Sequence, residues 1–239
     1  MNPCHALQTL HPLFSRRTGC AAALACLATV LAACGGGGDS SDTPPPPVVQ
    51  PVLDTLNPAV GGGTSYEART SMAPTNGADA SSMFDDFQPT AAARIASVKW
   101  QGIYCVQAAS APAPAPTATE FVVSFHADNA GRPVTTSTLA QARFTAAQTG
   151  QTPGGQVANL SCGTAASTTW ALYDYSVTLP TPFAAAAGTR YWVRVQAVTP
   201  SYDVFWGWRS GSTANAQSLM LFMGNFDSFT LDRAIRLAP

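Results

Sequence analysis

The stretch Glu120-Phe-Val-Val-Ser-Phe-His-Ala127 decides the fold class. Successive side chains of a β-strand point to opposite faces, so Phe121, Val123 and Phe125 share one face while Ser124 and His126 share the other. One apolar face and one more polar face are typical of a half-buried strand in a sheet.

The same two-residue alternation recurs along the chain, whereas no segment keeps the 3.6-residue period of a helix. Asp128 to Gly131 is a plausible β-turn, and loops are expected at Gly150 to Gly155 and Ala108 to Thr119. Short strands joined by such turns predict an all-β fold: one antiparallel, jelly-roll-like β-sandwich over residues 64–239. The expected strands are Ile95 to Val106, Glu120 to Ala127, Pro133 to Phe144, Trp170 to Leu179, Tyr191 to Val198, Asp203 to Arg209, Ser218 to Met223 and Asp232 to Leu237.

Residues 1–33 have the organisation of a signal peptide. Arg16 and Arg17 precede an uncharged apolar run, Cys20 to Val30, which is shorter than the about 20 residues that span a bilayer. The run ends in Leu31-Ala-Ala-Cys34, which resembles the lipobox of bacterial lipoproteins. That resemblance implies cleavage before Cys34 and attachment of a palmitate-type lipid to its thiol. The alternative is an ordinary signal peptide cut near Ala33.

Residues 34–63 read as a flexible tether. Gly35 to Gly38 and Pro44 to Pro47 cannot bury enough apolar surface to offset the entropy lost on ordering. Glycines make such a linker flexible and prolines make it extended. The residue after Cys34 is not aspartate, which resembles lipoproteins sorted to the outer membrane, so the expected location is the cell envelope, lipid-anchored, at the outer membrane.

Two cysteines remain once the signal peptide is removed and Cys34 is lipidated. In an oxidising compartment, Cys105 and Cys162 are most simply explained by a disulfide, with two free buried thiols as the alternative. Because the disulfide would close a long loop, the chain-entropy model gives it a contribution of about 3 to 4 kcal/mol to the free energy of unfolding.

Charge excludes one large class of partners. The chain has 12 basic and 13 acidic residues, and Lys99 is its single lysine. Without a basic patch, binding to nucleic acid is not expected.

Five short runs also resemble a group of uncharacterised jelly-roll domains of secreted and surface-anchored bacterial proteins. The resemblance covers most of residues 66–237 and implies a fold and a location, but no substrate or partner. His126 stands where that group leads us to expect an aromatic residue, and the cysteine pair is unusual for it. The runs are 84–87, 124–133, 179–183, 187–193 and 232–237.

Catalytic signals are few. His126 is the only histidine after the signal peptide, no Gly-x-Ser-x-Gly motif is present, and no zinc-ligand spacing appears. A glycosidase needs two facing carboxyl groups, and no spacing singles out a pair. We therefore expect no enzyme. The acids considered are Asp85, Asp86, Glu120, Asp174 and Asp203.

Calcium is the one cofactor considered. Asp85 and Asp86, near the domain start, could meet Asp232 near its end, and carboxylates are ligands that calcium prefers. Turn capping and solvation are the alternative explanation, since no EF-hand-like loop is present.

The aromatic segment near residue 205 is the main candidate for ligand binding. Trp206 and Trp208 share one face of a strand, so if exposed they could stack on sugar rings. Tyr202, Asp203 and Arg209 would then surround the ring. If that face is buried, the tryptophans belong to the core, which is the interpretation we favour.

These observations support three functions. The first is a non-catalytic, lipid-anchored protein whose β-sandwich binds a glycan or a surface protein. The second is a structural or assembly component of the envelope, and the third an enzyme acting on polysaccharide. Exposure of Trp206 and Trp208 beside a groove would favour glycan binding, whereas burial of both together with a flat polar surface would favour the structural role.

Overall fold

The computed structural model describes residues 50–56, 68–69, 71–72, 81–106, 116–158, 169–200, 204–212, 214–215 and 217–239. The predicted signal peptide, Cys34 and most of the tether lie outside these residues, as do Cys162, Tyr202 and Asp203. In the described part nearly all regular structure is strand, with one short 3₁₀ helix, η2 (Ala146–Thr149). The predicted all-β sandwich is confirmed.

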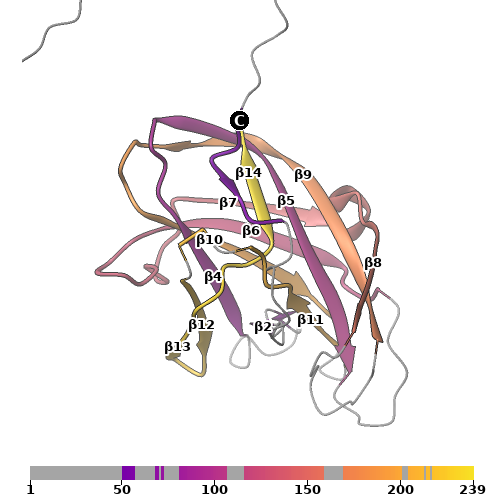
Figure 1. Cartoon of the computed structure of the whole chain (residues 1–239). Helices are drawn as coiled ribbons and strands as arrows, with labels where there is room; N and C mark the ends of the chain where they lie inside the picture. The colour runs from indigo at the N-terminus through magenta and orange to yellow at the C-terminus, as the bar shows by residue number, and fades with distance from the viewer. Residues whose placement is uncertain are drawn as a thin grey trace, which may run out of the picture. The chain divides into compact units, whose positions relative to one another are not determined.

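The strands form two sheets in the described part of the chain (Figure 1). In sheet A, the long strand β5 pairs with β9 along one side and with β14 and β11 along the other, and β8 extends the sheet beyond β9. The strands of sheet A are β1 (Leu53–Asp54), β14 (Ile235–Ala238), β5 (Ala93–Val106), β11 (Val204–Trp208), β2 (Ala68–Arg69), β9 (Thr169–Ala185) and β8 (Thr152–Ala158).

Sheet B is built around strand β10 (Tyr191–Val198), which pairs with β4 on one side and β6 on the other. Its order is β13-β12-β4-β10-β6-β7, so β13 and β7 lie at its opposite edges. The other strands are β13 (Asn225–Phe229), β12 (Ser218–Phe222), β4 (Ser82–Phe87), β6 (Glu120–Ala127), β7 (Ala140–Thr145) and β3 (Ser71–Met72), which pairs with β10 in parallel.

An aromatic core fills the space between the sheets. The ring of Trp100 stacks on that of Tyr175 with 5.3 Å between centroids, and Phe121 and Trp206 pack against Tyr175 at 4.8 Å and 5.9 Å. All four side chains are buried. Because aromatic side chains bury large apolar areas and pack in stacked or edge-on pairs, this cluster supplies much of the stabilisation of the sandwich.

Strand β9 contains a marked irregularity. Its pairing with β5 jumps from Thr178 opposite Ser97 to Phe183 opposite Ile95. The intervening residues 179–182, Leu-Pro-Thr-Pro, therefore fall outside the ladder. Proline has no N–H to donate to a ladder, which confines it to edges and bulges and explains why pairing is interrupted here.

Strand boundaries match the sequence prediction best where alternation is cleanest. Strands β6 and β10 have the predicted ends, whereas 133–144 forms a strand only from Ala140. The predicted loop at Gly150 to Gly155 is wrong in part, since β8 begins at Thr152. Strand β1 falls inside the range 34–63 assigned to the tether, and the buried Thr55 beside it donates a hydrogen bond to the Arg233 carbonyl at 2.6 Å.

Candidate functional site: a groove between the two sheets

The two tryptophans proposed as a sugar platform are in the core. Trp206 and Trp208 are completely buried. The indole of Trp206 donates to Tyr175 Oη at 3.2 Å, and that of Trp208 donates to the Ala234 carbonyl at 3.0 Å. The stacking platform is therefore wrong for these residues. The close approach of Gly102 to Trp206 explains the tight fit, since a Cβ at Gly102 would lie 2.2 Å from the indole.

The other residues proposed for the platform do not form a site with them. Arg209 is half-buried, and its Nη1 donates to Gln101 Oε1 at 2.9 Å. Gln101 in turn donates to Asp174 Oδ1 at 2.7 Å, which links three strands on the outer face of sheet A. Tyr202 and Asp203 lie outside the described residues.

The acids proposed for calcium lie near one another but are directed differently. Asp85 faces the core side of β4 and accepts a hydrogen bond from the Arg233 N–H at 3.2 Å. Asp86, the next residue, points to the opposite face and accepts from Arg190 Nε at 2.7 Å. Asp232 accepts hydrogen bonds from the backbone N–H groups of residues 214, 215 and 217.

This arrangement gives calcium no geometric support. No group of three or more histidine, cysteine, aspartate or glutamate side chains in the described residues could hold a metal ion. Burial raises the pKa of Asp85 well above its usual value, an effect that the nearby Asp232 increases and Arg233 opposes. The calcium site remains a prediction that the present contacts do not favour.

A serine and a histidine form a hydrogen-bonded pair that sequence reasoning missed. Ser124 Oγ lies 2.9 Å from His126 Nε2, and His126 Nδ1 lies 2.8 Å from the Val134 carbonyl. A serine, a base and an orienting acceptor are the elements of nucleophilic catalysis. Both side chains are buried, however, and burial lowers the pKa of His126. Catalysis would also need a path for substrate to these two buried side chains.

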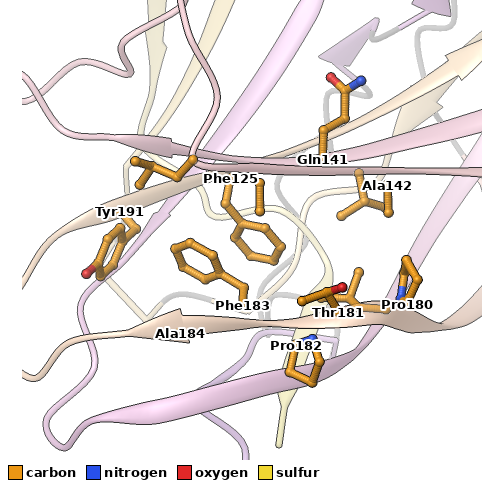
Figure 2. Close-up of a pocket in the computed structure, with 13 residues that line it drawn as sticks. Phe125, Gln141, Ala142, Pro180, Thr181, Pro182, Phe183, Ala184 and Tyr191 are labelled. Carbon is orange, nitrogen blue, oxygen red and sulfur yellow. The ribbon is translucent and has the colours of Figure 1, made fainter.

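A groove of about 600 Å³ lies where the two sheets separate. Strands β6 and β7 of sheet B form one wall, and the irregular segment of β9 in sheet A forms the other. Figure 2 shows the rings of Phe125 and Phe183 between these walls, with Tyr191 at one end and Pro180 at the other. The lining residues are Val123, Phe125, Leu139, Ala140, Gln141, Ala142, Leu179, Pro180, Thr181, Pro182, Phe183, Ala184 and Tyr191.

The groove is lined mainly by apolar residues, and none of the described residues that line it is charged. Phe125 and Phe183 stack with 4.3 Å between ring centroids, and Tyr191 meets Phe183 edge-on at 5.3 Å. Leu139 at its margin is 53% exposed. Of the three inward positions of β7, Ala140 and Ala142 are small and only Phe144 is large, so the sandwich is not filled by its own side chains beside Ala140 and Ala142. Such a cavity suits an apolar ligand.

Strand β7 is also open along its outer edge. Among the described residues it pairs only with β6. Since hydrogen bonds in an antiparallel ladder alternate and Ala146 N–H donates to the Thr119 carbonyl, the peptide groups of Gln141 and Arg143 point away from β6. The groove therefore lies beside unpaired backbone donors and acceptors.

Fold and groove together define a β-sandwich domain with an apolar cleft between its sheets. The family model described as "Domain of unknown function (DUF7901)" matches residues 50–227, and the chain belongs to that family. No curated protein and no solved structure matches the chain. Among the described residues, no helix is long and apolar enough to cross a membrane.

Proposed function

We propose that the mature chain is a non-catalytic, lipid-anchored envelope protein whose β-sandwich binds an apolar, uncharged ligand in the groove between β7 and β9. The observation that carries this proposal is the groove itself, which has about 600 Å³ of space, an aromatic floor and no charged lining residue. Exposed apolar surfaces of this kind mark interaction sites in soluble domains.

An apolar ligand is favoured over a glycan. Sugar rings stack on exposed aromatic faces, and the two indoles best placed by sequence for that role are completely buried. In the groove, Phe125 and Phe183 stack on each other, so their faces are already in contact. Most of the other lining residues are alanine, leucine and proline, which contact aliphatic groups better than hydroxyls, and the polar side chains among them are those of Gln141 and Thr181.

We propose a non-catalytic role because a substrate would have no access to the Ser124–His126 pair. Ser124 and His126 have suitable geometry, yet both are buried, and a nucleophile must reach its substrate. The groove contains no acid, base or thiol. It can therefore bind a ligand but offers no group for proton transfer beyond the Tyr191 hydroxyl, which accepts a hydrogen bond from Ala186 N–H at 3.1 Å.

A neutral fluorescent dye tests the groove. Nile red should become brighter with the wild-type mature chain carrying Cys34→Ser, because the groove excludes water from the dye. Ala142→Trp should reduce dye binding at least about tenfold by filling the space, a loss of roughly 1.4 kcal/mol. The matched control is Thr178→Trp, since Thr178 is an exposed residue of β9 that does not line the groove. If both variants lose dye affinity equally, or if neither variant loses it, the groove is rejected as the binding site.

Lipid attachment is tested separately. Cells supplied with labelled palmitate should incorporate it into the wild-type protein and not into Cys34→Ser, and only the wild type should sediment with the envelope. Cleavage after Ala33 with an unmodified cysteine would instead support the ordinary signal peptide. Separating the inner and outer membranes would then test the predicted outer-membrane location.

A Cys105 to Cys162 disulfide belongs to the same proposal, since it requires an exported protein. Cys105 is completely buried in a small cluster with Ile103, Trp170, Leu172 and Phe205. Cys162 is outside the described residues.

A role in assembly of the envelope is the second candidate. It is favoured by one specific observation, an exposed apolar turn between β12 and β13 that contains Met223, which is 69% exposed.

A further inference from the structure

The turn between β12 and β13 carries exposed apolar side chains where a polar turn is expected. Phe222 pairs with Asn225, so Met223 and Gly224 form a two-residue turn. Met223 is 69% exposed and Phe222 is 38% exposed. We call residues 222–224 the hairpin tip. No residue of the tip carries a charge.

Met223 also adopts an unfavourable backbone conformation. Its φ is +49° and that of Gly224 is +81°. Positive φ at both central residues is typical of the tight hairpin turn in which Asn-Gly or Asp-Gly is preferred. Methionine has a steric cost there that asparagine largely avoids. Because the side chain of Met223 is largely exposed, burial within the domain does little to offset that cost, and we take this apolar side chain as a surface for contact outside the domain.

The same molecule offers a surface that fits the tip. The groove is lined mainly by apolar residues and by no charged one among the described residues, the tip carries no charge either, and the groove's volume of about 600 Å³ has room for the side chains of Phe222 and Met223. The exposed Leu139 at the margin of the groove adds apolar surface at its entrance. Neither surface presents a charge that burial would leave unpaired, which would otherwise oppose the contact.

The positions of the two surfaces decide between contact within one chain and contact between chains. The hairpin β12–β13 forms one edge of sheet B, and β7, which forms the groove wall, is at the opposite edge. The tip therefore cannot reach the groove of its own sheet. A second copy can bring its tip to the groove, in a contact that uses two different surfaces.

We propose that the groove binds the Phe222–Met223 tip of a second copy of this chain, so that copies associate head to tail. The inference rests on the proposed function, because it names the ligand of the same groove. A row of copies then keeps one tip unoccupied at one end and one groove unoccupied at the other. Association is expected to be weak in solution, since few side chains are buried in each contact.

Analytical ultracentrifugation of the mature chain carrying Cys34→Ser tests the proposal. Between about 10 µM and about 1 mM, a range that covers weak association, the average mass of the wild type should rise beyond that of a dimer. Met223→Asn should remain monomeric although its turn is favourable, and Ala142→Trp should remain monomeric because its groove is filled. Thr178→Trp should associate as the wild type does.

Mixing the two monomeric variants gives the decisive result. Met223→Asn keeps an intact groove and Ala142→Trp keeps an intact tip, so an equal mixture should form dimers and stop there. If the wild type associates but the mixture stays monomeric, the contact lies on other surfaces and the proposal is overturned. If the wild type stays monomeric up to about 1 mM while Ala142→Trp still loses dye, the groove binds another ligand and only this inference fails.

Discussion

Asp85 is a buried acid whose protonation should make stability depend on pH. Its carboxyl group faces the core, Oδ1 has no hydrogen-bond partner among the residues that the structure describes, and burial raises its pKa well above the usual value. The charged groups around it are Asp232 and Arg233, with Asp86 behind the same strand. The folded state therefore holds a proton that the unfolded chain releases near pH 4.

The sign of the effect follows from this difference in bound protons. As pH rises above about 4, the unfolded chain loses the proton first, so the free energy of unfolding of the wild type falls by at most about 1.4 kcal/mol per pH unit until the folded state also releases it. Asp85→Asn cannot titrate and should gain stability relative to the wild type over the same range. Urea unfolding from pH 4 to 8 measures this, with exposed Asp227→Asn as control. A difference that grows in the opposite direction would mean that Asp85 is ionised and paired with Arg233.

At the scale of single residues, the sequence predicts which side chains share a face of a strand, but it does not predict which face is buried by the rest of the protein. Alternation correctly places Trp206 and Trp208 on one face, but an exposed platform and a core stripe have the same period. Their burial depends on β2, β5 and the sheet opposite, which no local pattern reveals. His126 is expected from sequence to be at the surface or half-buried, and its burial depends on contacts with the Val134 loop and Phe84.

Among the elements, the β12–β13 hairpin carries strain that can be removed. Met223→Asn should raise the free energy of unfolding by about 1 kcal/mol, because asparagine tolerates the positive φ that methionine resists. Chemical denaturation measures the change. Met220→Asn, which makes the same replacement within β12, should destabilise the protein. No gain for Met223→Asn would show that the methionine contributes contacts that offset its strain.

The groove cannot be predicted from elements taken singly. Its walls come from residues 123, 125, 139–142, 179–184 and 191, which meet only when the two sheets pack. The sequence does contain a signal in Leu179-Pro-Thr-Pro182, where two prolines interrupt a strand pattern. Those prolines indicate that a ladder must break near them, but not which neighbouring strand loses its pairing, because β5 lies far away in the chain.

For the molecule as a whole, the proposed disulfide between Cys105 and Cys162 should add to the free energy of unfolding. Reduction, or Cys162→Ser, should lower the free energy of unfolding by about 3 to 4 kcal/mol, because the loop from residue 105 to 162 would no longer be closed in the unfolded chain. Mass spectrometry with and without reductant should show a difference of two hydrogen atoms. Alkylation of both cysteines in unreduced, folded protein would contradict the pairing. Cys105→Ser is a less clean variant, because that side chain is completely buried.

The interrupted ladder in β9 also bears on how the protein resists aggregation. Amyloid grows when a new strand finds a continuous row of amide hydrogens to dock on. Residues 180 and 182 have none to offer. We expect this margin of sheet A to resist fibrillar growth even when neighbouring copies are crowded together.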